Sequence, residues 1–255
     1  MSELTTPARG GTLYIVPTPI GNLEDITLRA LRILRETGTI ACEDTRVTAN
    51  LLRHFDIPHK RLISYFAGNE QARVSQILQV LHAGEDVALV SDAGTPGISD
   101  PGTRLIAGAI REGIRVVPLP GPTAMVAAIT ASGLPTDSIL FEGFLPHKKG
   151  RRTAIGVLAA EERTMVLYES PHRIIKTLRE LAEHLGPDRP AVLCRELTKM
   201  YEEINRGTLG QLHDLYASRA SIKGEFVLVI SGRERRKGKE RDEDAPDGTG
   251  FDSEE

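Results

Sequence analysis

The sequence predicts an α/β protein built from two domains, each with a sheet flanked by helices. From Gly11 onward, short β-rich runs alternate with longer segments of helical period, which is typical of parallel sheets covered by helices. The chain has 255 residues, 40% of them hydrophobic, enough for two domains of about 100 to 150 residues each. The turn-forming run Ser132–Asp137 interrupts the alternation near its middle. We therefore expect an N-terminal domain over residues 11–133 and a C-terminal domain over 134–231.

The first half is expected to hold five strands and five helices. The segment 25–36 is an example, because Ile26, Ala30, Ile33 and Leu34 fall on one face of a helix. The predicted strands are Leu13–Val16, Thr39–Glu43, Leu62–Tyr65, Val87–Val90 and Arg115–Pro118. The predicted helices are Asp25–Glu36, Thr45–His54, one capped by Asn69 that runs to about Ala83, Gly102–Glu112 and Pro122–Ala131.

The second half is expected to continue the same alternation. Its predicted strands are Ser138–Glu142, Thr164–Tyr168, Ala191–Arg195, Tyr201–Arg206 and Glu225–Ile230, with a loop over Gly143–Gly150. Its predicted helices are Arg152–Ala160, Pro171–His184 and Gly210–Arg219. Residues 1–10 and the charged tail 232–255 contain few apolar side chains, so we expect both to be disordered.

Composition excludes several classes of protein. The two cysteines, Cys42 and Cys194, lie in apolar runs, which argues against a disulfide framework, and the scattered histidines form no pair at metal-ligand spacing. The start of the chain lacks a secretion signal and no run of about 18 apolar residues occurs, so we expect a cytoplasmic protein without a membrane span. Residues 233–255 hold nine acidic and six basic side chains, which accounts for the net charge of −3. The neutral remainder favours a local RNA site and no DNA binding.

Three Gly- and Pro-rich loops follow predicted strands of the first half. They are Pro17–Asn22, Ser91–Gly102 and Pro120–Thr123. Ligands of open parallel sheets bind outside the carboxyl ends of the strands, so three such loops favour a shared binding site. None has the pattern of a dinucleotide fold or a P-loop, and the prolines remove backbone donors that a phosphate would need. An adenosyl cofactor, held by backbone carbonyls and apolar contacts, fits these loops better.

Seven segments carry a resemblance to a known family. They are Leu13–Leu23, Glu43–Arg46, Leu89–Pro96, Val117–Pro122, Glu142–Pro146, Tyr168–Ser170 with His172 and Arg173, and Arg195–Lys199. In this order they resemble the tetrapyrrole-methylase family, and within it the members that methylate RNA of the small ribosomal subunit. The resemblance covers residues 11–231 and implies two α/β domains around S-adenosylmethionine, a homodimer, and 2′-O-methylation of a cytidine ribose in the decoding region of 16S rRNA.

The resemblance also implies a set of cofactor contacts. They are Pro19, Gly21, Ser91, Asp92, Ala93, Gly94, Thr95 and Thr123 in the first half, with Phe141, Leu197 and Gly224 in the second. Asp92 is open to two interpretations: it accepts a hydrogen bond from the cofactor, or it caps its own loop.

The remaining polar residues of the matched segments supply candidates for catalysis and RNA binding. The acid–base candidates are Lys199, Glu196, Glu43 and Asp44, with Glu169 as a further carboxylate. Lys199 is expected to have a lowered pKa and to act as the base, in which case Lys199→Ala abolishes turnover but not cofactor binding. The candidate phosphate contacts are Arg46, Arg173 and Arg195, and the basic patch Lys148, Lys149, Arg151 and Arg152. For each of these the alternative is an ordinary ion pair, a helix cap or a solvated loop.

Two other functions are compatible with the sequence. One is methylation of a tetrapyrrole or another small molecule, because a fold does not determine its substrate. The other is a ribosome-assembly factor without catalysis. The low aromatic content, 4% with no tryptophan, leaves few rings to stack on an RNA base. The candidates for stacking are Tyr65, Phe66, Phe144 and Tyr168.

Overall fold

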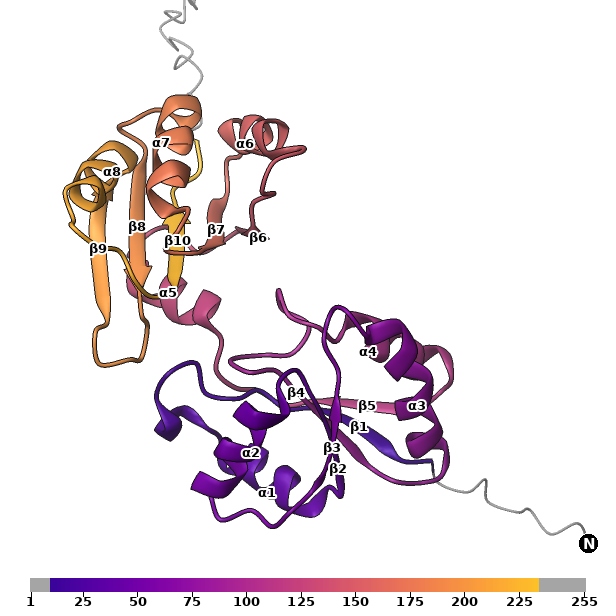
Figure 1. Cartoon of the computed structure of the whole chain (residues 1–255). Helices are drawn as coiled ribbons and strands as arrows, with labels where there is room; N and C mark the ends of the chain where they lie inside the picture. Colours follow the sequence, from indigo (N-terminus) through magenta and orange to yellow (C-terminus); the bar gives the residue numbers. More distant parts are fainter. Residues whose placement is uncertain (1–9, 234–255) are drawn as a thin grey trace, which may run out of the picture.

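A computed structural model of the chain describes residues 10–233, which form two five-stranded sheets (Figure 1). The N-terminal disorder and most of the charged tail that the sequence predicts therefore lie outside the described residues. The first sheet has the strand order β3-β2-β4-β1-β5 and all its pairs are parallel, as predicted. Its strands are β1 (Thr12–Ile15), β2 (Thr39–Cys42), β3 (Arg61–Ser64), β4 (Val87–Val90) and β5 (Arg115–Pro118).

Helices cover both faces of the first sheet. The apolar faces of α3 and α4 pack on one side, and those of α1 and α2 pack on the other. The bounds are α1 (Leu28–Glu36), α2 (Thr45–His54), α3 (Glu70–His82) and α4 (Thr103–Arg111). The single helix predicted over 25–36 is divided. A 3-10 turn, η1 (Leu23–Asp25), comes first, and Thr27 then caps α1 by accepting a hydrogen bond from the Ala30 amide.

The second sheet has the strand order β6-β7-β10-β8-β9. Only β6 and β7 are parallel, so the prediction of a parallel sheet is wrong for this half. The strands are β6 (Ile139–Phe144), β7 (Thr164–Glu169), β8 (Pro190–Arg195), β9 (Glu203–Thr208) and β10 (Phe226–Ile230). β6 runs further than predicted, and β9 begins two residues later because Lys199–Glu202 form turns instead.

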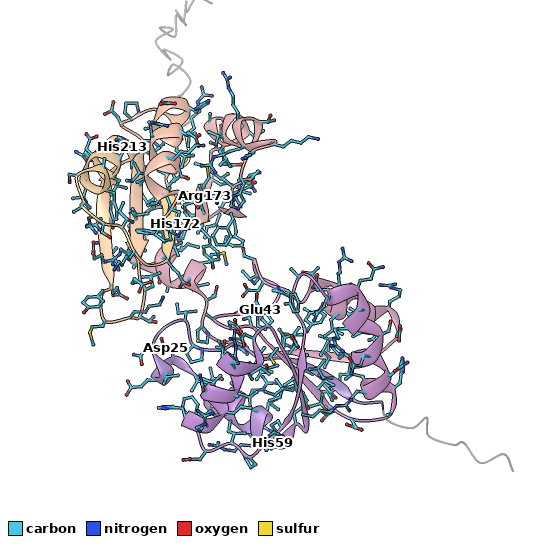
Figure 2. The ribbon with its side chains drawn as sticks, in the orientation of Figure 1. Asp25, Glu43, His59, His172, Arg173 and His213 are labelled. Carbon is cyan, nitrogen blue, oxygen red and sulfur yellow. The ribbon has the colours of Figure 1, made fainter. Side chains whose placement is uncertain are left out.

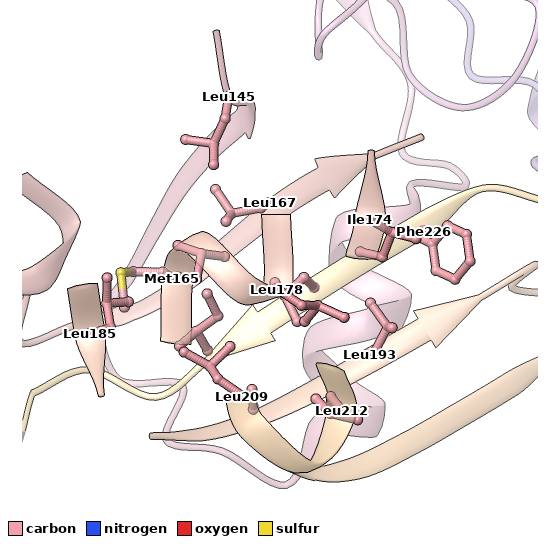
Figure 3. Close-up of a cluster of buried hydrophobic side chains, with 14 of the residues drawn as sticks. Leu145, Met165, Leu167, Ile174, Leu178, Leu185, Leu193, Leu209, Leu212 and Phe226 are labelled. Atoms are coloured by element: carbon pink, nitrogen blue, oxygen red, sulfur yellow. The ribbon is translucent and has the colours of Figure 1, made fainter. Parts of the chain in front are cut away.

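Side chains of the second sheet alternate between two cores, as the period of a strand requires. Met165, Leu167 and Leu228 face a cluster formed with α6 (Arg151–Ala159), α7 (Ile174–Leu185) and α8 (Leu209–Ala217), shown in Figure 3. Val166 and Val227, one residue along, face the opposite cluster.

Helix α5 (Ala124–Ser132) covers that opposite face. Its Ala128 and Ile129 are buried against Val166 and Val229 of the second sheet. The sequence placed this helix in the first half. Its packing joins it to the second, and the domain boundary after residue 133 stays a prediction. The loop over 119–123 is thus the segment of chain that passes from the first sheet to the helix of the second.

No helix in the described part of the chain is long and apolar enough to cross a membrane.

Candidate functional site

The three Gly- and Pro-rich loops meet at the carboxyl ends of β4, β1 and β5, which are neighbours in the sheet. Thr18 and Gly94 join two of the loops, each amide donating a 2.9 Å hydrogen bond to the other's carbonyl. The Thr95 hydroxyl ties in the third by donating to the Pro122 carbonyl at 3.0 Å. Gly94 has a φ of +84°, a conformation that favours glycine. The sequence therefore builds one rigid floor from three loops.

A cavity of about 540 Å³ lies between this floor and the second sheet. Seven of the predicted cofactor and acid–base residues line it: Glu43, Asp92, Ala93, Gly94, Thr95, Thr123 and Glu169. Glu43 lies on the side of the first half that faces the second, as Figure 2 shows. The second half contributes a wall of residues in or next to β6, β7 and β10, namely Phe144, Tyr168, Glu169, Ser170, Pro171, Glu225, Phe226 and Val227.

Other predicted cofactor contacts lie elsewhere. Pro19, Gly21 and Ser91 line a neighbouring hollow of about 390 Å³ beside α2, which Asp92 shares with the main cavity. Three residues of the second half line neither space. Phe141 packs on Tyr168, Leu197 is buried in the core under α5, and Gly224 lies under the Glu196 side chain, which a Cβ there would meet at 2.5 Å.

The main cavity is acidic. Among the described residues that line it there are five carboxylates and no lysine, arginine or histidine. Glu169 and Glu225 pair with Arg173 and Lys199 from outside the lining, so Glu43, Asp92 and Asp100 are the carboxylates that give the cavity its charge. Burial and the charge of Glu43 raise the pKa of Asp100 to about 6. Burial and the charge of Asp92 raise the pKa of Glu43. Carboxylates that disfavour each other in this way attract a cationic ligand.

Sequence reasoning missed Asp100 and Glu225. Asp100 is the second aspartate of the Ser91–Gly102 loop and follows Ser99, whose φ is +62°. That loop was selected from the sequence for its glycines. The presence of a second aspartate in the same loop was the feature that could have identified Asp100. Glu225 precedes β10 and carried no motif.

Asp92 and Asp44 have structural partners. Asp92 Oδ1 accepts a 2.9 Å hydrogen bond from the Asp44 amide, so it braces a neighbouring loop and not its own. Asp44 caps α2 by accepting from the Arg46 amide at 2.8 Å, and its carboxylate pairs with the Arg46 guanidinium at 2.6 Å. These bonds lower the pKa of Asp44 to about 2. A carboxylate so engaged is a helix cap and a poor proton acceptor at neutral pH.

The segment Arg195–Lys199 of the second half contacts the first loop of the first half. Glu196 and Thr198 both have left-handed backbone, with φ of +51° and +67°, strain that concentrates at functional positions. The Asn22 amide of the first half donates to Thr198 Oγ1 at 3.2 Å. Gly21 lies so close to Lys199 that a Cβ there would come within 2.3 Å of the lysine Cγ.

Lys199 is held between two carboxylates. Its ammonium lies 2.8 Å from Glu196 Oε1 and 3.0 Å from Glu225 Oε2. Burial acts to lower the pKa of Lys199, but the hydrogen bonds to the two glutamates outweigh it and the pKa is raised. The expectation of a lowered pKa is therefore wrong.

Three of the arginines predicted to bind RNA are engaged inside the protein. Arg151 is 5% exposed and donates to Glu180 and Thr177, both at 2.7 Å. Arg173 pairs with the buried Glu169 at 2.7 Å, and Figure 2 shows it within the second half. Arg195 pairs with Glu203 at 2.6 Å. These contacts correct the assignment of the three as phosphate contacts, and they give Glu169 a structural role. Lys148, Lys149, Arg152 and Arg46 are exposed.

The fold and the cavity together define a two-sheet α/β protein with a cavity between the carboxyl ends of a parallel sheet and a second, mixed sheet. The chain belongs to the tetrapyrrole (corrin/porphyrin) methylase family, whose model matches residues 12–213.

Curated relatives carry the name ribosomal RNA small subunit methyltransferase I. The protein of Halalkalibacterium halodurans is 52% identical to this chain, with 87% of this chain and 76% of the relative covered. The protein of Escherichia coli O157:H7 is 48% identical, with 92% and 81% covered. The protein of Hydrogenobaculum sp. is 49% identical, with 86% and 95% covered.

Solved structures support the fold. The methyltransferase CobJ superimposes with a TM-score of 0.67 at 21% identity, covering 89% of this chain and 97% of that one. A uroporphyrin-III C-methyltransferase from Thermus thermophilus, in complex with S-adenosylhomocysteine, has a TM-score of 0.61 at 19% identity and covers 87% of this chain and 97% of that one.

Proposed function

We propose that this protein is an S-adenosylmethionine-dependent methyltransferase of small-subunit ribosomal RNA, and that its acceptor is a cytidine 2′-hydroxyl in the decoding region of 16S rRNA. The observation that carries the RNA substrate is the 48–52% identity to relatives named for that activity, over 86–92% of the chain. A cytoplasmic homodimer acting on the small ribosomal subunit is part of the same proposal and rests on the family resemblance.

The main cavity suits S-adenosylmethionine. Its carboxylates match the positive charges of the sulfonium and amino groups, while Ile98, Tyr168 and Val227 offer apolar surface to the adenine. Gly94 lines the cavity without a side chain, and an added Cβ would lie 3.3 Å from Cγ2 of Ile20, another lining residue. When bound, the cofactor supplies an activated methyl group. Ala93, Gly94, Thr95 and Thr123 are proposed to hold it, with Asp92 bracing the loop.

The task of the chain's own residues is to position the attacking hydroxyl and to accept its proton. Glu43 and Asp100 suit the second role, because both line the cavity and both have raised pKa values, that of Asp100 to about 6. Glu196 and Lys199 are proposed to act as a charged pair that holds the strained segment against the loop of the first half. Asp44 is left out of the catalytic set because it caps α2.

RNA contact is proposed for the exposed cations. Lys148, Lys149 and Arg152 flank the start of α6, and Arg46 lies in the first turn of α2, three residues after the cavity residue Glu43. Positive charge outside the cavity is suited to phosphate, whereas the acidic interior is suited to neutral or cationic groups.

The test is transfer of labelled methyl from S-adenosylmethionine to small subunits isolated from cells that lack the enzyme, followed by digestion to nucleosides and mass analysis. The expected product is 2′-O-methylcytidine, or a cytidine with methyl on both base and ribose. Label on no subunit or RNA, despite cofactor binding, would refute the proposal and leave a small-molecule methylase or an assembly factor.

A matched pair of glycine variants separates the cavity from general damage. Gly94→Ala and Gly133→Ala both place alanine in left-handed backbone, with φ of +84° and +75°, but only Gly94 lines the cavity. Gly133 has no atom within 4 Å of the added Cβ. Cofactor binding and transfer are expected to fall in Gly94→Ala and to persist in Gly133→Ala.

A further inference from the structure

One aromatic ring at the mouth of the cavity is exposed. Phe144 ends β6 with 53% of its surface accessible, although the residue is large and apolar. Of the four aromatic residues that the sequence nominated for stacking, Tyr65 is 1% exposed and Phe66 does not line the cavity. Phe144 and Tyr168 both line it, and Tyr168 is the more buried.

A β-bulge determines the direction of Phe144. Phe141 pairs with Val166, and Phe144 pairs with Tyr168. The two paired positions are thus three residues apart on β6 but only two apart on β7. Val166 and Tyr168 share a face of the sheet, and the extra residue therefore brings Phe141 and Phe144 to that same face. Regular pairing would have sent Phe144 to the opposite face, toward α6 and α7.

The backbone at the bulge is specialised. Gly143 has a φ of +68°, and a Cβ there would lie 2.9 Å from the Ser99 hydroxyl of the first half. Glycine is thus required both by the conformation and by the close approach of the cavity loop.

The bulge builds a row of three rings. Tyr168 meets Phe141 edge-on with centroids 5.1 Å apart, and Phe144 edge-on with centroids 5.7 Å apart. The Tyr168 hydroxyl accepts a 3.1 Å hydrogen bond from the Met125 amide, which fixes the middle ring. Phe144 is therefore supported on one side and open on the other.

The charges around Phe144 favour the approach of a neutral base over that of a phosphate. The cavity interior carries carboxylates and would repel a phosphate, whereas Lys148 and Lys149 follow Phe144 on the same loop. Lys148 and Lys149 are four and five residues after Phe144, so the chain holds both within at most about 18 Å of it. A nucleotide that enters would leave its phosphates at the rim and bring its neutral base and ribose inside.

We propose that Phe144 is the platform on which the base of the acceptor nucleotide stacks after it leaves its neighbours in the RNA. The stacked base would hold the ribose at the cavity where the methyl group is delivered. This inference rests on the proposed function, and it assigns one residue to recognition of an unstacked base.

The test compares Phe144→Leu with Phe144→Trp in methyl transfer to small subunits that lack the modification. Leucine keeps apolar bulk but offers no flat face, so the apparent KM for subunits should rise roughly tenfold to a hundredfold, the range that loss of one base–aromatic stack produces. Tryptophan should remain within a few-fold of the wild type. Phe66→Leu, at another exposed phenylalanine, should behave as wild type.

Two further readouts make the result decisive. The Kd for S-adenosylmethionine and the Tm should be unchanged in Phe144→Leu, because the ring is exposed and lies at the mouth. A wild-type KM in Phe144→Leu would overturn the inference and leave the proposed function intact. A parallel loss of cofactor affinity would also overturn it, by placing the ring in the cofactor site. Failure of the wild-type protein to methylate subunits would refute the proposed function, and the stacking role with it.

Discussion

The ammonium of Lys199 donates a 2.8 Å hydrogen bond to the Glu196 carboxylate, across a segment whose backbone is left-handed at Glu196 itself. With a second bond to Glu225 at 3.0 Å, this contact raises the pKa of Lys199 although burial opposes it. The lysine is therefore protonated at neutral pH, and it has no lone pair with which to act as a base.

Lys199→Arg should retain turnover within about tenfold of the wild type, because a guanidinium keeps the positive charge and cannot lose a proton. Lys199→Ala should lose more, since Glu196 and Glu225 are then left without their cation. Turnover over a range of pH checks both. Equal inactivation by arginine and alanine would restore the lysine to the role of base.

Asp100→Asn should stabilise the protein at neutral pH. The pKa of Asp100 is raised from 3.8 to about 6 in the folded state, so the unfolded chain releases this proton first and the folded state loses stability as pH rises from about 4 to 6. The variant removes that loss, and its free energy of unfolding above pH 6 should exceed the wild type's by roughly 1–3 kcal/mol. Urea unfolding at pH 4 and pH 7.5 measures the difference, with the exposed Asp137→Asn as control.

The same substitution should weaken cofactor binding. If the carboxylate faces a cation, the affinity of the wild type for S-adenosylmethionine increases as Asp100 ionises between about pH 5 and 7. Calorimetry should find this dependence reduced in Asp100→Asn. A binding constant of the variant that varies with pH as the wild type's does would remove Asp100 from the site.

Arg151 and Arg152 are adjacent in sequence, but substitution by alanine should affect stability at Arg151 and RNA binding at Arg152. Arg151 is buried against Glu180, Thr177 and Glu169, and loss of its charge should cost roughly 3–5 kcal/mol of unfolding free energy. Arg152 is exposed, and Arg152→Ala should change stability by less than about 0.5 kcal/mol. Its effect should be on RNA, as a smaller dependence of binding on salt. Stability curves and salt titrations of both variants distinguish the two roles.

Glu203 should support stability in mild acid. Hydrogen bonds from Arg219, at 2.7 and 3.2 Å, together with those from Asn205 and Arg195, hold the pKa of Glu203 at about 2 although partial burial opposes them. Its contribution is present above pH 4.5 and disappears as pH falls toward 2. Glu203→Gln should therefore lose about 1 kcal/mol at pH 7 and differ little from the wild type near pH 2. Glu183→Gln, in an exposed pair, is the control, and a similar loss there would show that the pairing of Glu203 is unimportant.

Sequence pattern predicted what depends on local periodicity. The ten strands were each found within a few residues, and the three loops at the ends of β1, β4 and β5 do meet. Both follow from alternation along a strand and from the way parallel strands end at one edge.

The sequence pattern could not predict the features that depend on contacts between residues distant in the chain. The antiparallel direction of β10 and the packing of α5 on the second sheet both involve contacts between residues far apart in the chain. Whether Arg151 or Arg152 is buried depends on the phase of α6, which Glu169 and Glu180 determine from β7 and α7. The bulge in β6 had a signal in Gly143, but its effect on Phe144 needed the register with β7.

The place of β10 at the centre of the second sheet has a consequence for biosynthesis. This strand is the last described element of the chain, yet it lies between β7 and β8 and covers α5. The first sheet is complete once β5 has been synthesised, so the N-terminal half can fold while translation continues. The C-terminal half has to wait for Phe226–Ile230. A message cut short before those codons would yield a protein that lacks the β10 wall of the cavity and leaves the apolar face of α5 partly uncovered, which favours degradation by cellular proteases.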